Sequence, residues 1–214
     1  MTSYFDKYGD SSGGSLNDIC EKYRIATRKN SIAVIALQSK HKILSESELL
    51  QEIDRHYHED CECGMKGMAT IEMMAKKLFE AQDTSWSKEF LRQKKETKWD
   101  YDTCLRWMKN LMGKNSFRGK HMEDCAIEEL KKHIWKFDIV KSDEKTDVES
   151  AVDILVKKDD EIIAGIQVKP STFYHMGILY VAELNRKLEY PVVDLIYNKA
   201  GEFTNFLSVV SNWI

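Results

Sequence analysis

The sequence lacks the features that would place it in a membrane or outside the cell. No apolar run approaches the roughly 20 residues that a transmembrane helix requires. The N-terminal stretch MTSYFDKYGDSSGGS has neither the basic nor the apolar region of a signal peptide. The five cysteines are odd in number and scattered, which argues against a disulfide framework. These absences predict a soluble cytoplasmic protein, in a reducing compartment and with no membrane partner.

The length of 214 residues suits one domain, or one domain with a sizeable subdomain. Residues 1–14 are rich in glycine and serine and predict a flexible lead. Residues 15–116 predict a largely helical region, because apolar residues recur there at helical intervals. Helices are expected within 15–28, 45–60, 69–83 and 101–114, the last closed by Gly113, whereas 31–39 is ambiguous between helix and strand.

Residues 117–214 have a different pattern, in which strands alternate with helices. The expected order is a helix over 119–135, strands within 136–142, 150–158 and 161–172, a helix over 180–190, a strand over 191–198 and a helix over 203–214. Short connections between the first three strands favour an antiparallel meander, and the crossover helix favours a parallel return. The predicted fold class is therefore α+β (α/β), a mixed β-sheet flanked by helices, with a largely helical N-terminal half.

The formal net charge of −3 hides a basic segment between Trp86 and Lys120. This segment holds ten lysines and arginines against four acids, with six aromatic residues among them. A basic segment with interleaved aromatic residues indicates a polyanion partner. The alternative is a solvated helical surface whose aromatic residues simply pack inward.

Polar side chains interrupt the most strand-like segment, AGIQVKPST at residues 164–172. Gln167 and Lys169 share one face of the expected strand, opposite to its apolar residues. If the preceding strand pairs through the short turn at 157–160, Asp153 falls beside Gln167 on that same face. Carboxylate and amide oxygens suit Mg²⁺, and a neighbouring lysine can position a water and offset the charge of a phosphate.

These residues resemble a known motif. Asp153, thirteen intervening residues and then Gln167-Val168-Lys169 are similar to the PD-(D/E)xK nuclease motif, in a QxK variant with glutamine in place of the usual acid. The amide keeps an oxygen ligand but removes one negative charge. The resemblance therefore implies a metal site in which another acid carries more of the binding.

The elements around the motif are also similar to the core of the PD-(D/E)xK superfamily, over about residues 117–198. Gly119 is followed four residues later by Glu123, which resembles the metal-facing glutamate of the family's preceding helix. The resemblance implies that residues 117–214 form the nuclease core and that residues 15–116 serve recognition and dimerisation.

Compact members of this superfamily with helical additions include type II restriction endonucleases, which the chain resembles. The resemblance implies a Mg²⁺-dependent, sequence-specific deoxyribonuclease that hydrolyses phosphodiester bonds in double-stranded DNA. It also implies a homodimer, because both strands of a palindromic site are cut, and a cognate DNA methyltransferase as a functional partner in the cell. Two alternatives stay open: a structure-specific nuclease such as a resolvase or repair enzyme, and a non-catalytic DNA-binding protein on a degenerate core.

The resemblance assigns the catalytic roles to Asp153, Gln167, Lys169 and Glu123. The metal ligands would be Asp153, the side-chain oxygen of Gln167, the backbone carbonyl of Val168, and Glu123. Lys169 would orient the attacking water.

Further candidates surround this set. The acids that compete with Glu123 for the metal are Glu128, Glu129 and Glu149. The residues proposed to contact DNA lie at the end of the active strand and in the basic segment, and are Ser171, Thr172, His175, Lys114, Arg118 and Lys120.

Two other groups of reactive side chains are weaker candidates. Four ligands fall within eight residues in HYHEDCECG, but closely adjacent pairs are unfavourable for a tetrahedral zinc site; they are His56, His58, Cys61 and Cys63. Zinc binding by this cluster is therefore left open. Cys125, near His121 and His133, suggests a thiol nucleophile, but its helical context favours a place in the core instead.

Overall fold

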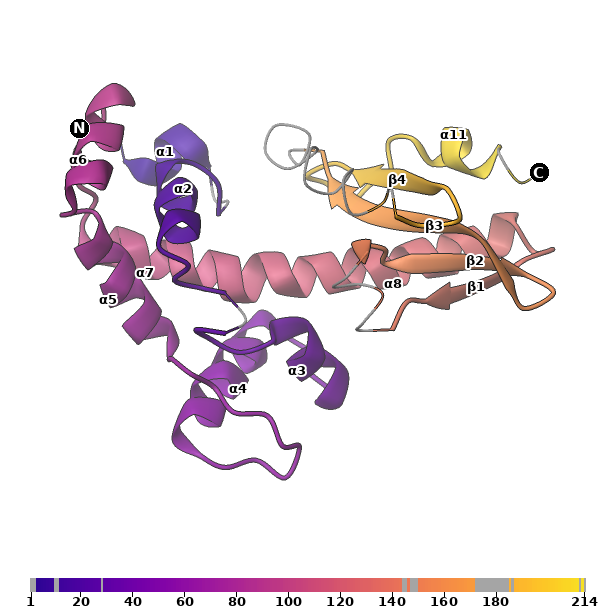
Figure 1. Ribbon diagram of the computed structural model, residues 1–214, viewed down its shortest axis with the longest axis horizontal. Coiled ribbons are helices and arrows are strands. Elements are labelled where there is room, and N and C mark those ends of the chain that lie inside the picture. The colour runs from indigo at the N-terminus through magenta and orange to yellow at the C-terminus, as the bar shows by residue number, and fades with distance from the viewer. Residues whose placement is uncertain are drawn as a thin grey trace. The chain divides into compact units, whose positions relative to one another are not determined.

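The computed structural model divides the chain into two compact units, Met1–Arg118 and Gly119–Ile214 (Figure 1). Each unit has a hydrophobic core of its own. The described residues are 3–9, 12–27, 29–143, 146, 150–171, 185, 187–211 and 213. Asp153, Gln167, Lys169 and Glu123 all belong to the second unit.

The described part of the first unit is built from helices. They are α1 (Tyr4–Tyr8), α2 (Ser15–Lys22), α3 (Val34–Lys40), α4 (Glu46–His58), α5 (Ile71–Ala81), α6 (Ser85–Gln93), α7 (Tyr101–Lys109) and the π-helical segment η1 (Asn110–Asn115). The segment that was ambiguous between helix and strand therefore forms a helix, α3. The sequence pattern did not predict α6.

Side-chain caps explain where four of these helices begin. Ser45, Thr70, Thr84 and Asp100 each accept a hydrogen bond from the backbone N–H three residues further on. Such caps satisfy N–H groups that have no partner inside the helix. A capping residue followed by an apolar stripe thus fixes the starts of α4, α5, α6 and α7.

The core of the first unit gathers the apolar stripes of its helices. Ile19 of α2, Ile53 of α4, Leu78 of α5 and Trp107 of α7 are fully buried. The indole N–H of Trp107 donates to the backbone carbonyl of Gly13, which satisfies the polar atom of this large side chain. Burying whole stripes stabilises these short helices, which would be marginal alone.

The expected flexible lead of residues 1–14 contains an ordered helix, α1. Tyr4 is only 1% exposed, and its ring makes an edge contact with Trp99 at a centroid distance of 4.9 Å. Glycine and serine indicated flexibility, but the two tyrosines of α1 and Phe5 supply apolar surface that packs against the core.

Gly113 does not close a helix. It lies inside η1, and helical structure runs on from Tyr101 to His133. A Cβ atom at Gly113 would lie 3.0 Å from side-chain carbons of Leu50 in α4, so the close approach of α4 accounts for the glycine. A glycine signals a helix end only where its backbone leaves the helical region.

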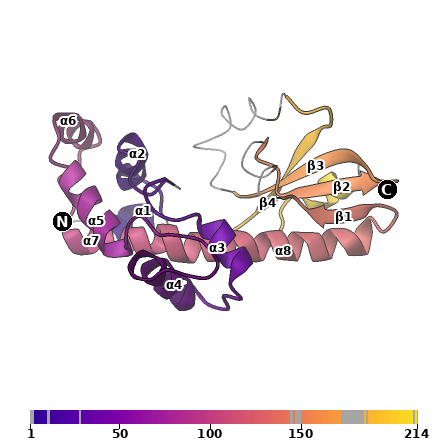
Figure 2. The ribbon, with the colours of Figure 1, turned by 60° about the horizontal axis from the view of Figure 1, so that its bottom comes forward.

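The second unit combines a mixed sheet with helices. Its described elements are α8 (Ser116–His133, whose first turn precedes the unit boundary), β1 (Asp138–Lys141), β2 (Ile154–Lys158), β3 (Glu161–Pro170), β4 (Val192–Tyr197) and α11 (Phe206–Val210). The helix expected over 180–190 falls largely outside the described residues. Met122, Ala126 and Leu130 of α8 share a core with the sheet and with α11. Figure 2 shows α8 running along the sheet.

The sheet has the order β1-β2-β3-β4 and confirms the predicted mixed topology. β1 and β2 pair antiparallel, as do β2 and β3, whereas β3 and β4 pair parallel. The fold class is therefore α+β, with an antiparallel meander followed by one parallel strand. The parallel pair brings the carboxyl end of β3 next to that of β4.

A β-bulge near the β2–β3 turn changes which residues of β3 share a face of the sheet. Val156 pairs with Ala164, but Lys157 pairs with Ile162, so β3 carries one extra residue there. Ile162 is consequently 38% exposed and does not share a buried face with Ala164, contrary to strict alternation. The alternation holds from Ala164 onward, which is the part of β3 that leads to Gln167.

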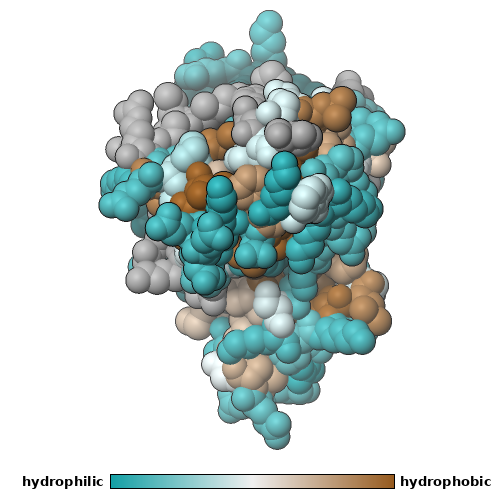
Figure 3. Space-filling view, turned by 90° about the vertical axis from the view of Figure 1, so that its right-hand side faces the viewer, coloured by the Kyte–Doolittle hydropathy of each residue, from teal (hydrophilic) through white to brown (hydrophobic). Residues whose placement is uncertain are grey.

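No helix among the described residues is long and apolar enough to span a membrane. The face shown in Figure 3 is mostly hydrophilic, with small apolar areas between polar side chains. Two large apolar side chains of the second unit, Trp135 and Leu207, are strongly exposed.

Candidate active site

The pairing of β2 with β3 sets Asp153 opposite Gln167. Ile154 pairs with Ile166, and the backbone N–H of Asp153 donates to the carbonyl of Ile166 at 3.1 Å. On the other side, the backbone N–H of Ser142 donates to the carbonyl of Asp153 at 3.0 Å. Asp153 therefore precedes β2 in a backbone that is held from both sides.

The Asp153 carboxylate is buried and holds the end of the β3 motif. Its Oδ2 atom accepts a 2.7 Å hydrogen bond from the backbone N–H of Val168. The same oxygen lies 3.4 Å from Nζ of Lys169. The side chain of Asp153 is 6% exposed and that of Lys169 is 22% exposed. Both contacts use Oδ2, so they leave Oδ1 as a further ligand atom.

Gln167 presents a buried oxygen that has no hydrogen-bond partner among the described residues. The residue is fully buried, and its Nε2 donates to the carbonyl of Ala151, which fixes the orientation of the amide. The other amide atom, Oε1, is then left unsatisfied. A buried polar atom without a partner destabilises a fold by roughly 1–3 kcal/mol, and a bound cation would satisfy it.

Glu123 contacts a lysine that the sequence pattern did not identify. Nζ of Lys141, at the end of β1, lies 2.6 Å from Oε2 of Glu123 and 3.9 Å from Oδ1 of Asp124. Burial would lower the pKa of Lys141, but the hydrogen bond to Glu123 and the charges of Glu123, Asp124 and Asp153 outweigh it, so the pKa is raised. The negative charges of Glu123 and Asp153 thus both stabilise the ammonium group of Lys141.

The three competing acids are placed differently from Glu123. Glu129 pairs with Lys132 on the surface of α8, Glu128 is exposed, and Glu149 lies outside the described residues. Asp194, which the sequence pattern did not identify, is the register partner of Gln167 in β4. Neighbouring residues in register project from the same face of a sheet, so Asp194 adds an acid beside the motif.

We expect replacement of Lys141 by methionine to lower the free energy of unfolding by about 1 kcal/mol, because Glu123 then loses its charged partner. The matched control is Lys132→Met on α8, whose ion pair with Glu129 is more exposed and should contribute little to stability. Urea unfolding in EDTA measures both variants. Equal losses in the free energy of unfolding for the two variants would show that the contact between Lys141 and Glu123 stabilises the protein no more than the exposed pair does.

Gly165 keeps the backbone close to the residue before Asp153. A Cβ atom at Gly165 would lie 2.9 Å from Cγ1 of Val152, which is fully buried. We expect Gly165→Ala to lower stability by about 1–3 kcal/mol through overpacking. Gly119→Ala is the matched control, because a Cβ there meets nothing within 4 Å. Melting temperatures that fall equally for the two variants would contradict this account.

The residues proposed to contact DNA are only partly described. Ser171 is exposed directly after β3, whereas Thr172 and His175 lie outside the described residues. Lys114, Arg118 and Lys120 are half-buried in η1 and α8, and each has an interaction partner within the protein.

The basic segment is partly absorbed by internal contacts. Trp107 belongs to the core, and Lys98 lies 3.7 Å above the ring of Phe79. Trp86 stays 40% exposed and stacks on Phe90 at 4.9 Å. Some aromatic residues of the segment therefore pack inward, as the alternative predicts, and others stay at the surface, so a polyanion partner of this segment stays a prediction.

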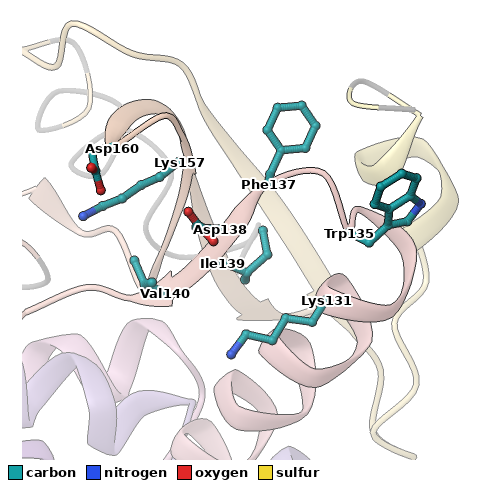
Figure 4. A pocket seen from close by; sticks show the side chains of 8 residues that line it. All are labelled: Lys131, Trp135, Phe137, Asp138, Ile139, Val140, Lys157 and Asp160. Atoms are coloured by element: carbon teal, nitrogen blue, oxygen red, sulfur yellow. The ribbon is translucent and has the colours of Figure 1, made fainter.

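A shallow pocket lies away from the motif residues Asp153, Gln167 and Lys169. Lys131 and Trp135 near the end of α8 line it together with Ile139 of β1, and Lys157 and Asp160 contribute from the β2–β3 hairpin (Figure 4). The hairpin is at the far end of β2 from Asp153. The pocket thus contains none of the motif residues.

Cys125 has no features of a nucleophile. Its Sγ atom is 3.6 Å from Nε2 of His121, but burial and the nearby acids, Glu128 first among them, raise the pKa of the thiol. His133 uses Nδ1 to contact the carbonyl of Glu129. Cys125 is half-buried, so the expected core position is also only partly correct.

The mixed four-stranded sheet with its helices is consistent with an α+β nuclease-like fold, and the buried Asp153 and Gln167 lie beside Lys169 at the strand ends. Comparison with protein families agrees with this class. A family model for the MjaI restriction endonuclease matches residues 16–202, which is most of the chain. The chain therefore belongs to the MjaI restriction endonuclease family. Searches of curated proteins and of solved structures found no match.

Proposed function

We propose that this protein is a Mg²⁺-dependent, type II site-specific deoxyribonuclease whose active site is a QxK variant of the PD-(D/E)xK motif. The observation that carries the proposal is the convergence of Asp153, Gln167 and Lys169 at the ends of two paired strands. Membership of a restriction endonuclease family supports the same substrate, double-stranded DNA.

The donor set fits a hard divalent cation. Asp153 and Glu123 offer carboxylate oxygens, Gln167 offers its unsatisfied Oε1, and Val168 offers its backbone carbonyl. Oxygen ligands with a small number of carboxylates suit Mg²⁺, which keeps several waters. Within the described residues, Gln167 Oε1 is the strongest single indication of a bound cation, because this buried oxygen has no hydrogen-bond partner.

Glu123 would reach the metal only by giving up part of its contact with Lys141. In the described arrangement, the Lys141 ammonium neutralises Glu123 in place of a metal cation. Glu123 would have a positive partner both without the metal, when Lys141 pairs with it, and with the metal bound. The acid is therefore never left buried and unpaired. Lys141 is thus proposed as the counterion that holds Glu123 ready.

The proposed reaction is hydrolysis of a phosphodiester bond. A water oxygen bonds to phosphorus and the bond from phosphorus to the 3′-oxygen breaks. The water loses one proton and the leaving 3′-oxygen gains one, so that 5′-phosphate and 3′-hydroxyl ends result. Lys169 hydrogen-bonds the attacking water and orients it, while Asp153 holds the Lys169 ammonium in place. Bound Mg²⁺ supplies electrostatic stabilisation of the charge that develops on the phosphate.

The remaining roles follow from the same proposal. Ser171 directly after β3 is placed to contact the DNA backbone, together with Thr172 and His175. Lys114, Arg118 and Lys120 add positive charge. Residues 15–116 would supply recognition and the contacts of a homodimer, so that both strands are cut, and a methyltransferase with the same specificity would protect the cell's own DNA.

Digestion of unmethylated duplex DNA of phage size tests the proposal, with sequencing of every end produced. Discrete fragments sharing one short motif are expected with Mg²⁺ and not with EDTA, and Lys169→Ala should leave the DNA intact. If neither Mg²⁺ nor Mn²⁺ supports cutting, the proposal fails. Branched substrates and simple binding then separate a structure-specific nuclease from a non-catalytic DNA-binding protein.

A further inference from the structure

A second cluster of ligand-type side chains lies in the first unit, remote in sequence from the nuclease motif. It consists of His41 directly after α3, His56 in α4, and Cys61 and Cys63 in the segment after α4. One nitrogen or sulfur atom from each of the four residues lies within 4.8 Å of all the others. Both cysteines are free thiols.

The spacing of these atoms fits a tetrahedral metal site. Nε2 of His56 is 3.2 Å from Sγ of Cys63, and Nε2 of His41 is 3.9 Å from Sγ of Cys61. Zinc bonds of roughly 2.0–2.3 Å at tetrahedral angles place neighbouring ligand atoms about 3.3–3.8 Å apart. The observed separations therefore need only small adjustments to surround one ion.

Second contacts orient the ligands toward a common point. Nδ1 of the fully buried His56 lies 2.7 Å from the carbonyl of Glu52, so Nδ1 carries the proton and Nε2 is left as the ligand. The backbone N–H of Met65 donates to Sγ of Cys63 at 3.4 Å. Hydrogen bonds of this kind stabilise a thiolate bound to a metal.

Individual hydrogen bonds hold the segment that carries the cysteines. No regular element among the described residues covers 59–70. Gly64 has a φ of +74°, and its N–H donates to the carbonyl of Cys61, which turns the chain back. Nζ of Lys40 donates to the carbonyl of Cys63 at 2.8 Å, beside His41. A metal ion here would join the end of α3, α4 and this segment.

We propose that His41, His56, Cys61 and Cys63 bind one structural Zn²⁺ ion. The set has the Cys₂His₂ composition of closed structural sites, and two thiolates neutralise the charge of the ion. Binding releases one proton from each thiol, so the site forms with the loss of two protons. All four ligand positions come from the protein, which favours a structural over a catalytic ion.

The structure differs from the sequence pattern in one ligand. The local run of ligands contains His58, but that side chain is exposed and outside the cluster. His41, fifteen residues before His56 in the sequence, takes its place. The added ligand from another segment removes the objection that adjacent pairs cannot close a tetrahedron.

Metal analysis of two histidine variants tests the site. The full-length protein is expressed with zinc, desalted and analysed by inductively coupled plasma mass spectrometry. About one zinc per chain is expected in the wild type and in His58→Ala, and less than about 0.2 in His41→Ala. Cys125→Ser serves as a control for a cysteine near a histidine, and should keep its zinc. A wild type without zinc, or loss of zinc in His58→Ala instead of His41→Ala, would overturn the proposal.

Thiol titration of the wild type gives an independent test that needs no variant. Burial raises the pKa of Cys20 to about 11 and that of Cys104 to about 12, so neither reacts in the folded protein. A zinc chelator should expose two additional reactive thiols, mapped by mass spectrometry to Cys61 and Cys63, and lower the melting temperature by about 5 °C or more. If labelling of Cys61 and Cys63 is complete before chelation, zinc does not occupy the cluster.

Discussion

Asp153→Asn is expected to slow DNA cleavage at least about a thousandfold while leaving DNA binding nearly unchanged. Asparagine keeps the shape of the side chain and can still accept the hydrogen bond from Val168. It removes the negative charge that would attract the cation and that holds Lys169. The fold is therefore retained while the proposed chemistry is lost.

Single-turnover cleavage in Mg²⁺ and binding of the same duplex in Ca²⁺ measure the two effects separately. Asp138→Asn is the matched control, because Asp138 is exposed at the far end of β1. Lys169→Met should resemble Asp153→Asn, since it removes the group proposed to orient the water. A variant at Asp153 that cuts at the wild-type rate would exclude this residue from the active site.

Gln167→Glu is expected to make the stability of the protein depend strongly on Mg²⁺. In EDTA, a glutamate would place a second buried carboxylate next to Asp153. It would also turn an oxygen that cannot donate toward the carbonyl of Ala151, which accepts a hydrogen bond from Nε2 of Gln167 in the wild type. We expect a loss of about 3 kcal/mol in the free energy of unfolding under these conditions. A bound cation would pair with both carboxylates and recover at least about 1 kcal/mol in about 10 mM Mg²⁺.

Denaturant unfolding with and without Mg²⁺ measures this dependence, and Gln167→Leu is the control. Leucine removes the oxygen ligand together with the hydrogen bond to Ala151. The free energy of unfolding of Gln167→Leu should therefore be the same in EDTA and in Mg²⁺. If Gln167→Glu also shows no response to Mg²⁺, then Oε1 of Gln167 does not face a metal site.

The polar cluster in β2 and β3 could be anticipated because its determinants are local. Alternation fixes which residues share a face, and the sequence pattern placed Asp153 beside Gln167, as the structure does. The turn alone, which pairs Lys158 with Glu161, would set Asp153 opposite Ile166. The extra residue of the bulge at Lys157 shifts the register and sets Asp153 opposite Gln167. The mixed sheet followed from the same local patterns.

Features that depend on contacts between distant segments could not be read in this way. Gly113 was expected to end a helix. The glycine is instead explained by close contact with Leu50, which lies in another helix and is not visible in the local sequence. Lys141 ends a short strand and resembles any solvated lysine until α8 brings Glu123 to it. His41 likewise joins its cluster only through the packing of α3 beside α4.

Iron-mediated cleavage of the polypeptide tests the central claim most directly, namely that Asp153 and Gln167 hold a divalent metal. Fe²⁺ replaces Mg²⁺ in the DNA-bound protein, and ascorbate with peroxide cuts the chain near the bound ion. The account predicts cuts close to residues 123, 153 and 167 that Mg²⁺ suppresses and that Asp153→Asn abolishes. Cuts at these positions that persist in Asp153→Asn, or Mg²⁺-sensitive cuts only elsewhere in the chain, would contradict it.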